Sequence, residues 1–460
     1  MSFPVPAQRM TSLDAGFLYL ERPRVPLHVG CLVRLDGPLS LDALLRHLRS
    51  RLPRLRRFAQ RAAPAPLSLV HPAWENDRDF DLRDHVQRWQ VPDAGGEREL
   101  GELLETLMAR PLERARPMWE AHLLEGRDDD ATALLLKVHH CMIDGVSGAA
   151  LLDVLLEATP HPPQRVAAAP PEDPPAPAAR AAAAAATALV RPARLAVEAL
   201  GALRRPDALR RSAAALRDAR SFARAATLGE RQRLPWNAPL GFRRRLSLTR
   251  LPLIEARWIR SAYGGTINDV VLSVLAGGLR RYLQATGVPF RDVSLHALVP
   301  VSLRAPGEVA SLGNRLSALR VPLAVEPESE LERLAATSAT MERLKARRAF
   351  EGLALLLGAI ELLPAPLVAL VASRISLGAF AHLVATNVPG PRELRYVAGR
   401  RVSAIHAIAP VTDGVGLSIA VFSYAGSLHI GLYADADLAP DLDKLRSGIE
   451  EAFAALRGSA

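Results

Sequence analysis

A segment rich in proline and alanine divides this sequence into two parts that must fold around separate cores. It runs from Thr159 to Arg180 and reads TPHPPQRVAAAPPEDPPAPAAR. Proline interrupts helices and sheets, and alanine offers little apolar surface, so the stretch predicts a linker. The length of 460 residues also exceeds what one ordinary core supports. We therefore expect domains at 1–160 and 234–460, joined by a Pro/Ala/Arg-rich helical linker at 161–233.

The residues that follow these prolines carry most of the positive charge of the chain. The whole chain has a net charge of +10. Between residues 180 and 224, ten arginines stand against three acidic residues, so an excess of seven charges is local. The alanine- and leucine-rich composition predicts helices that Pro192 and Pro206 interrupt. Two interpretations stay open: a solvated helical linker, or a basic amphipathic helix that lies on an anionic membrane.

The composition gives little support to several other classes of protein. No zinc-finger spacing or RNA-binding aromatic motif accompanies the basic segment, so we expect no nucleic-acid partner. Two cysteines, Cys31 and Cys141, predict neither a disulfide framework nor a cysteine metal site. The first sixteen residues lack the apolar centre of a signal peptide, which favours a cytoplasmic location. The apolar stretch 352–372 has the length of a membrane span, but Glu361 and two prolines favour a buried or interfacial helical hairpin.

Hydrophobic periodicity predicts alternating helices and strands in both parts. Ser40 can cap a helix that buries leucines at helical spacing. The continuous apolar run 131–138 predicts a buried strand, and a helical pattern returns at 148–158. In the second part we expect a helix within 264–283, strands at 294–304, 416–424 and 427–433, and a helix from residue 440 onward.

Two consecutive histidines, His139 and His140, stand where the buried strand at 131–138 ends. Asp144 lies four residues beyond the second histidine, and Gly145 permits a close turn. A lone histidine is usually a hydrogen-bonded core residue, but a pair at a strand end beside a carboxylate favours a functional site. Because the unperturbed pKa of imidazole is about 6.5, its neutral form can accept a proton at neutral pH. The pattern predicts a base that deprotonates a bound hydroxyl, amine or thiol.

Other chemistries that use histidine fit the surrounding residues less well. GVSGA at 145–149 has the wrong order for the G-x-S-x-G elbow of serine hydrolases. Cys141 adjoins His140, and adjacent residues on a strand point in opposite directions, which disfavours a Cys–His pair. His122 is a conceivable third metal ligand, but HExxH-type spacing is absent, so we expect no metal. GVGLSIA at 414–420 lacks the third glycine of a dinucleotide-binding loop.

The stretch HHCMIDG, residues 139–145, resembles the HHxxxDG motif of the bacterial wax ester synthase/diacylglycerol acyltransferase family. That motif is shared with chloramphenicol acetyltransferase-like proteins and with peptide-synthetase condensation domains. Other stretches resemble landmarks of the first family: MTSLDAGFLYLERPRVPLHVG near the start, PMWE at 117–120, TINDVVLSVLAGGLRRYL, VPVSLR, LGNRLSALRVPL and TNVPGP. Two departures, Met118 for leucine and Thr386 for serine, keep apolar packing and a hydroxyl. The resemblance covers almost the whole chain except the linker.

The resemblance implies an α/β fold of the α+β type, with two chloramphenicol acetyltransferase-like domains and the active site at their interface. It implies an O-acyltransferase that moves a fatty acyl group from acyl-CoA to a hydroxyl of diacylglycerol or a long-chain alcohol, giving triacylglycerol or wax ester. No cofactor is implied beyond acyl-CoA as substrate. The implied partners are acyl-CoA, the lipid acceptor, and the surface of the inner membrane or of lipid inclusions, where the protein would bind peripherally.

The resemblance also implies roles for individual residues. His140 would be the general base, and His139 would support it. Asp144 would hold the loop through an ion pair with an arginine. Asn268 would donate a hydrogen bond to the oxyanion or organise its site, unless it serves only as a helix N-cap. The remaining candidates, as structural or channel-lining residues, are Gly145, Pro117, Trp119 and Asn387, with Trp119 equally open as an ordinary core residue.

Three other functions stay open at this point. A protein of the same fold could condense or transfer acyl groups onto a polyketide, amine or sugar. A thioesterase would use water as the acceptor. A catalytically silent lipid-binding protein would need no base, and the intact HHxxxDG argues against it because such a protein could lose His140 freely. The acceptor and the acyl chain length depend on the shape of the channel.

Overall fold

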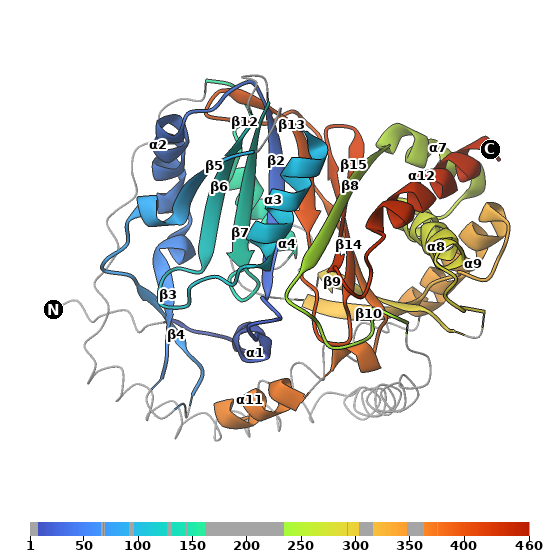
Figure 1. Ribbon diagram of the computed structural model, residues 1–460, viewed down its shortest axis with the longest axis horizontal. Helices are drawn as coiled ribbons and strands as arrows, with labels where there is room; N and C mark the ends of the chain where they lie inside the picture. Colours follow the sequence, from blue (N-terminus) through green and yellow to red (C-terminus); the bar gives the residue numbers. More distant parts are fainter. Residues whose placement is uncertain are drawn as a thin grey trace, which may run out of the picture.

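The computed structural model describes residues 8–65, 68, 70–91, 96–126, 131–143, 145–161, 234–291, 293–302, 316–346, 360, 363–374 and 376–459. Within these ranges the chain forms two six-stranded sheets that stand side by side, as Figure 1 shows. The predicted linker, including the basic segment at 180–224, lies outside the described residues except for His161. The architecture is the mixed α/β arrangement that the sequence predicts.

The first sheet has the strand order β12-β13-β2-β7-β6-β5. These strands are β2 (His28–Asp36), β5 (Val86–Gln90), β6 (Trp119–Glu125), β7 (Ala131–His139), β12 (Tyr396–Val397) and β13 (Arg400–Ile408). The helices of this part are α2 (Leu41–Arg51), α3 (Glu97–Ala109) and α4 (Gly145–Leu155). Ser40 caps α2 as predicted, accepting a hydrogen bond from the Ala43 amide. The buried strand expected at 131–138 is confirmed as β7, which is antiparallel to both of its neighbours.

The second sheet has the order β10-β9-β11-β14-β15-β8. Its strands are β8 (Arg244–Pro252), β9 (His296–Ser302), β10 (Leu316–Pro322), β11 (Leu383–Pro389), β14 (Leu417–Tyr424) and β15 (Ser427–Asp435). Four helices cover it: α7 (Leu253–Tyr263), α8 (Ile267–Ala285), α9 (Glu330–Ala346) and α12 (Leu442–Gly458). Their apolar faces and the sheet form one core, so the helices and strands expected in this part are confirmed.

One segment of the second part belongs to the first sheet, which differs from the predicted division at residue 234. β13 pairs antiparallel with β2 from Val402 opposite Leu35 to Ile408 opposite Gly30, and β12 extends the sheet beyond it. Val402 and Ile405 are buried in the first core, so this crossing strand removes apolar surface from water there. The second part therefore contributes β12 and β13 to the first sheet, and the two parts also share an interface.

A third core joins the two parts. It combines Leu104 and Met108 of α3 with Leu246 of β8, Ile408 of β13 and Tyr433 of β15. The hydroxyl of Tyr433 donates a hydrogen bond to the carbonyl oxygen of Met108 at 3.1 Å. Because these residues come from both halves of the sequence, the relative placement of the sheets is fixed by buried contacts.

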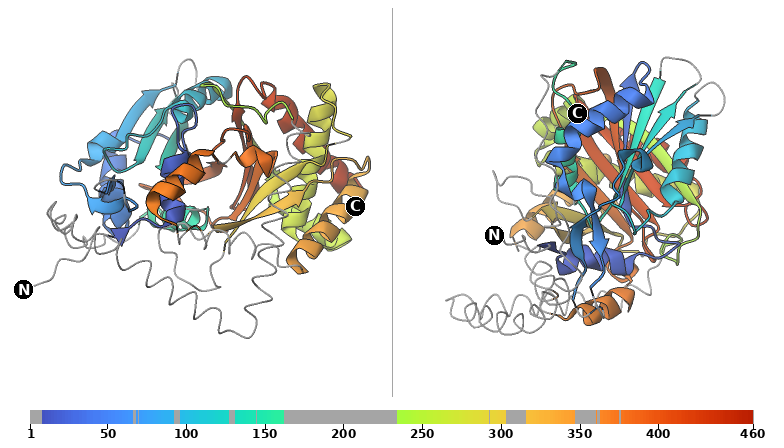
Figure 2. Two further views of the ribbon diagram at one scale, coloured as in Figure 1. Left: turned by 90° about the horizontal axis from the view of Figure 1, so that it is seen from below. Right: turned by 90° about the vertical axis from the view of Figure 1, so that its left-hand side faces the viewer.

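Two short helices, α1 (Ser12–Leu20) and α11 (Ala365–Arg374), lie against each other at the lower edge of the molecule. Figure 1 and the view from below in Figure 2 show them beneath the two sheets. None of the helices in the described ranges is long and apolar enough to cross a bilayer. The remaining elements are β1 (Gln8–Arg9), β3 (Gln60–Ala63), β4 (Ala73–Asn76) and the 3-10 helices Leu52–Arg54, Arg56–Ala59, Leu82–His85 and Leu377–Ala379.

Candidate active site

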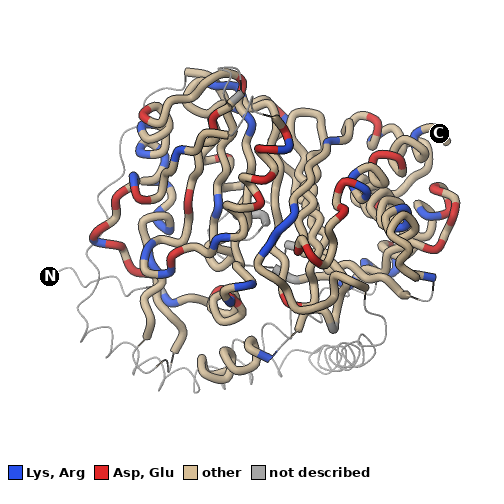
Figure 3. The backbone as a smooth tube through the Cα atoms, in the orientation of Figure 1, with Lys and Arg blue, Asp and Glu red and all other residues tan. Residues whose placement is uncertain are grey.

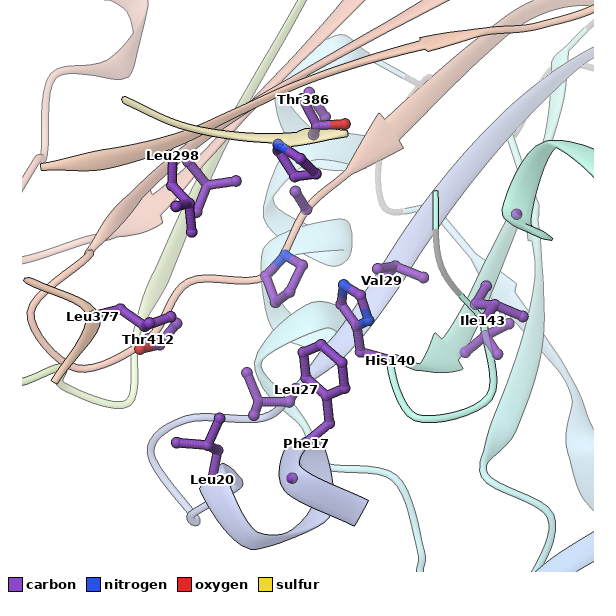
Figure 4. A pocket seen from close by; sticks show the side chains of 18 of the residues that line it. Phe17, Leu20, Leu27, Val29, His140, Ile143, Leu298, Leu377, Thr386 and Thr412 are labelled. Carbon is purple, nitrogen blue, oxygen red and sulfur yellow. The ribbon is translucent and has the colours of Figure 1, made fainter. Parts of the chain in front are cut away.

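A cavity of about 440 Å³ lies between the two sheets and above α1 and α11. Its walls come from both halves of the sequence: α1, β2, β7 and α4 from the first half, and β9, β11, α11 and β13 from the second (Figure 4). The walls are almost entirely apolar, as in sites that take hydrocarbon chains. The polar side chains among the described lining residues are Ser12, Arg22, Cys31, His140, Thr386, Thr412 and Asp413.

His140 projects into this cavity from the turn that follows β7 (Figure 4). Its amide donates a hydrogen bond to the carbonyl oxygen of Leu27 at 2.8 Å, which anchors the backbone of the turn. The ring of Phe17, on α1, stacks on the imidazole with centroids 4.1 Å apart and 15° between the planes. The predicted base therefore lies in the apolar space between the two parts, with one face of its ring covered.

His139 points to the opposite side of β7 and does not line the cavity. It is 0% exposed, and its Nε2 lies 3.3 Å from a carboxylate oxygen of Glu21. The amide of Cys141 donates a hydrogen bond to Nδ1 at 3.1 Å, so the ring proton of the neutral form sits on Nε2, facing Glu21. The two histidines thus diverge as alternation along a strand requires, and His139 can act on the site only through its neighbour.

The positions of the cysteines and of His122 do not support the Cys–His pair or the metal site that the sequence raised as alternatives. Burial raises the pKa of Cys141 well above its usual value, so its thiol stays protonated. Cys31 lines the cavity, and burial raises its pKa to about 12. His122 is buried elsewhere, 3.1 Å from Glu120 and accepting a hydrogen bond from the Trp89 indole. The described ranges contain no group of three ligands that could hold a metal ion.

Asn268 lies in the first turn of α8, as the sequence predicts, but it is not the N-cap. Thr266 is the N-cap, and it forms a capping box with Asp269. The amide of Asn387, on β11, donates a hydrogen bond to the side-chain oxygen of Asn268 at 3.2 Å. Thr386, the residue before Asn387, lines the cavity on the wall opposite His140. The two asparagines therefore form a pair beside the cavity wall, outside its described lining.

Pro117, Trp119 and Asn387, which the sequence left open as structural or channel-lining residues, are not among the described residues that line this cavity. Trp119 is a core residue: its indole donates a hydrogen bond to the Phe58 carbonyl at 2.8 Å, and it stacks on His85. Pro117 is buried at the start of the same strand. The side chain of Asn387 points away from the cavity because residues alternate along β11 and Thr386 and Val388 face inward.

The loop of the motif is only partly described. Asp144 lies outside the described residues, and Gly145 begins α4. Two residues that the sequence analysis did not single out, Phe17 and Glu21, contact the histidine pair. They lie four apart in the stretch FLYLE, which is the spacing that places two side chains on one helix face. That spacing was the available signal.

Arg22 ties three segments together at the edge of the cavity. Its guanidinium lies 3.3 Å from the carboxylate of Asp413 and donates a hydrogen bond to the Ser373 carbonyl at 2.7 Å. Ser373 belongs to α11, whereas Arg22 follows α1 directly. Arg22 therefore joins the end of α1 to α11 and to the loop that contains Asp413, at the edge of the cavity.

Family models and curated relatives cover nearly the whole chain. The model of the wax ester synthase/diacylglycerol acyltransferase catalytic domain matches residues 10–271, and the WS/DGAT C-terminal domain matches residues 312–457. A probable diacylglycerol O-acyltransferase of Mycobacterium tuberculosis is 34% identical over 460 residues, covering 97% of this chain and 95% of its own. A putative diacylglycerol O-acyltransferase of Mycobacterium bovis is 30% identical and covers 96% of each chain.

Solved structures show the same fold. A wax ester synthase/diacylglycerol acyltransferase from Marinobacter aquaeolei superposes with a TM-score of 0.67 at 23% identity, covering 98% of each chain. The first condensation domain of the calcium-dependent antibiotic synthetase superposes with a TM-score of 0.60 at 18% identity, covering 99% of this chain and 96% of its own. The predicted two-part acyltransferase fold is therefore confirmed.

Proposed function

Because this chain belongs to the wax ester synthase/diacylglycerol acyltransferase family, it is an acyl-CoA-dependent O-acyltransferase, and we propose that His140 is its general base. The products are triacylglycerol or wax ester. One observation carries the assignment of the base: His140 brings an imidazole into an apolar cavity that both halves of the chain line. A base must lie where the acceptor hydroxyl and the acyl donor meet, and an apolar cavity lined by both halves of the chain suits such a meeting point.

The reaction needs one base and no covalent enzyme intermediate. The unprotonated nitrogen of His140 takes the proton of the acceptor hydroxyl while the oxygen attacks the carbonyl carbon of the thioester. The tetrahedral intermediate then collapses, the carbon–sulfur bond breaks, and the imidazolium returns the proton to the CoA thiolate. The products are an ester and free CoA, and the histidine regains its starting form. Acyl-CoA enters this sequence as a substrate, with no further cofactor.

The developing oxyanion needs a hydrogen-bond donor, and we assign that role to Thr386. Its side chain lines the wall opposite His140, so a carbonyl held between them would meet a base on one side and a hydroxyl on the other. Asn268 would organise this wall through its hydrogen bond with Asn387, the next residue on β11. Asp144 and Gly145 keep their proposed part in shaping the loop after β7.

The base assignment is tested with radiolabelled palmitoyl-CoA and four acceptor conditions: hexadecanol, diacylglycerol, both together and none. Thin-layer chromatography separates wax ester, triacylglycerol and free fatty acid. We expect labelled ester in the wild type and a fall of about 100-fold or more for His140→Ala. Ester formation that persists in His140→Ala would exclude this residue as the base. Free fatty acid as the main product would instead indicate a thioesterase, and transfer that requires a carrier protein would indicate a condensation enzyme.

The donor assignment is tested by a matched pair of variants at Thr386. Thr386→Ser keeps the hydroxyl, whereas Thr386→Val keeps the shape and removes it. Loss of one oxyanion donor costs about 100-fold or more in kcat in well-studied cases, so we expect Thr386→Val to lose at least tenfold more than Thr386→Ser. Equal activities in the two variants would show that the hydroxyl is not the donor.

We further propose that α11 contacts a lipid surface from which the acceptor enters. The helix separates the cavity from the outside: Val368, Val371 and Ala372 line the cavity. On the outer face, Leu367 and Leu370 are 41% and 51% exposed. Figure 3 shows α11 without charged residues except at one end. An exposed apolar face of this kind partitions into the boundary between headgroups and acyl chains.

The basic segment 180–224 would add attraction to an anionic surface. Under this proposal the protein binds peripherally to the cytoplasmic face of the inner membrane or to lipid inclusions. Flotation with anionic vesicles at low salt tests the contact. Leu367→Glu/Leu370→Glu should release the protein from vesicles, whereas Ile254→Glu/Trp258→Glu on α7, another exposed apolar pair, should not. Equal loss in both variants would exclude α11 as the contact.

A further inference from the structure

A buried carboxylate, that of Glu21, lies behind the strand that carries the histidine pair. Its side chain is 5% exposed. Glu21 ends α1, where its amide donates a hydrogen bond to the carbonyl oxygen of Phe17 at 3.1 Å. Burying a charged group costs free energy unless several hydrogen-bond donors face it, so the partners of Glu21 indicate its role.

Both oxygens of the Glu21 carboxylate have partners. One oxygen lies 3.3 Å from Nε2 of His139 and accepts a hydrogen bond from the Leu27 amide at 3.1 Å. The other accepts a hydrogen bond from Arg114 at 2.8 Å. Burial alone would raise the pKa of Glu21, but the interactions with His139, Arg114 and Leu27 lower it to about 2. The group is therefore an anion at every pH at which the enzyme would work.

This anion fixes the orientation of His139. The Cys141 amide donates to Nδ1, so the proton of the neutral ring lies on Nε2, the nitrogen that is 3.3 Å from the Glu21 carboxylate. Nδ1 is thus held by a hydrogen bond and Nε2 by the nearby charge of Glu21, and a rotation of the ring would weaken one of these two interactions. Because Cys141 follows His140 directly, the hydrogen bond to its amide also shapes the turn that aims His140 into the cavity.

Glu21 reaches His140 by two other routes. The Leu27 residue that donates its amide to Glu21 accepts, through its carbonyl oxygen, the hydrogen bond from the His140 amide at 2.8 Å. Phe17, one helical turn before Glu21, stacks on the His140 ring. Glu21 therefore contacts Leu27, which binds the backbone of His140, and Phe17, which stacks on its ring. It also contacts His139, the residue before His140.

We infer that Glu21 is a positioning residue for the acyl transfer: it holds the turn after β7, through His139 and Leu27, in the conformation that aims the imidazole of His140 at the acceptor hydroxyl. The inference rests on the proposed role of His140 as base. It predicts that loss of the Glu21 charge lowers kcat and leaves substrate affinity nearly unchanged, because Glu21 itself lies outside the described cavity lining.

Glu157 provides a matched control in the same part of the protein. Its carboxylate is 6% exposed and also bridges an arginine and a histidine, pairing with Arg51 and lying 3.4 Å from Nδ1 of His47. Within the described part of the chain it does not line the cavity, and its ion-pair partners are Arg51 and His47 and not the histidine pair. Glu157→Gln therefore removes the same kind of buried charge while leaving the site untouched.

The experiment compares Glu21→Gln, Glu157→Gln and His140→Ala in the full chain, with kcat, KM for palmitoyl-CoA and thermal midpoint for each. We expect Glu21→Gln to lose about tenfold or more in kcat with KM within about twofold, which corresponds to a transition-state effect. Glu157→Gln should lower the thermal midpoint and keep kcat within about twofold. A fall in kcat of the same size in both glutamine variants would overturn the inference and assign Glu21 to stability alone.

Two further variants keep the test decisive. Glu21→Gln/His139→Gln should be no slower than the slower single variant, because two residues that act as one unit give non-additive losses. If Glu21→Gln does not fold, Glu21→Asp keeps the charge but shortens its reach, and the same loss in kcat is expected. Retained activity in His140→Ala would refute the proposed base. Loss in His140→Ala with full activity in the Glu21 variants would refute only the positioning role.

Discussion

The ring of Phe17 stacks on the imidazole of His140 with 4.1 Å between the ring centroids and 15° between the planes. Phe17 comes from α1, at the start of the chain, and His140 from the turn after β7. The stacked ring of Phe17 restricts the rotation of the imidazole, which would be freer if both of its faces were open to the cavity. A base transfers a proton only when its nitrogen is within hydrogen-bond reach of the hydroxyl, so this restriction bears directly on rate.

We therefore expect Phe17→Leu to lower kcat while the protein stays folded. Leucine keeps an apolar contact but cannot present a flat ring. Aromatic pairs are worth about 0.5–1.5 kcal/mol beyond the area they bury, which corresponds to roughly two- to tenfold in rate if the loss falls on the transition state. Initial rates of ester formation measure the change, with Leu20→Met, on the same wall, as the volume-conserving control. Unchanged kcat in Phe17→Leu would show that the stack does not orient the base.

The elements around this stack could be predicted because their signals are local. The apolar run 131–138 predicted β7, and Ser40 predicted the start of α2, because strand burial and helix capping depend on residues close in sequence. The divergence of His139 and His140 also follows from alternation alone. Phe17 and Glu21 share a helix face, but nothing local says that this face meets the end of β7.

Features that depend on distant pairing could not be predicted. β13 joins the first sheet by pairing with β2, more than 360 residues earlier in the chain, and no periodicity specifies a partner at that distance. The choice between a structural and a channel-lining role for Trp119 and Asn387 could not be made from the sequence for the same reason. Each lies on a strand, and which face of the strand meets the cavity depends on how the two sheets are stacked.

Buried histidines should make the protein lose stability below neutral pH. Burial, together with the nearby positive charges of protonated His429, Arg34 and Arg250, lowers the pKa of His406 to about 3. Burial also lowers the pKa of His296 to about 4. In the unfolded chain these groups titrate near pH 6.5, about where free imidazole does. Between that pH and pH 4 the unfolded state binds more protons, so the free energy of unfolding falls as the pH falls.

Urea denaturation at pH 7, 6 and 5 measures this dependence. Each such histidine contributes at most about 1.4 kcal/mol per pH unit. His406→Gln should flatten the dependence, whereas His161→Gln, at an exposed position, should leave it unchanged. Glu21 does not contribute in this window: its pKa of about 2 adds stability that is present above pH 4.5 and lost as the pH falls toward 2. An identical slope in wild type and His406→Gln would contradict the prediction.

Cys31 can report whether substrate fills the cavity. It lines the cavity, and burial raises its pKa to about 12, so the reactive thiolate is scarce at neutral pH. In a Cys141→Ser background one thiol remains. We expect slow labelling by an alkyl maleimide that accelerates with rising pH and slows when hexadecanol is present. Mass spectrometry follows the adduct. Labelling that is fast at pH 7 and indifferent to hexadecanol would mean that the cavity is not where the alcohol binds.

The close approach of β15 to β13, the strand that crosses into the first sheet, depends on a glycine on β15. A Cβ built on Gly431 of β15 would lie 2.2 Å from the carbonyl oxygen of Ala407 on β13, and backbone cannot move aside as a flexible side chain can. Ala407 also lines the cavity, so a shift there would change the site as well as the interface. Glycine at 431 is therefore required by space, and its small size sets how closely β13 packs against the second sheet.

Gly431→Ala should lower the free energy of unfolding by about 1–3 kcal/mol or more, as overpacking of a tight core does. Gly101→Ala is the matched control: Gly101 lies in α3 with nothing within 4 Å of an added Cβ, and alanine there should stabilise the helix by about 0.5–1 kcal/mol. Urea denaturation of the two variants should therefore move in opposite directions. Since the strain falls on Ala407, we also expect Gly431→Ala to lose ester synthesis at temperatures where it remains folded. A variant as stable and active as the wild type would show that the two strands can separate without cost.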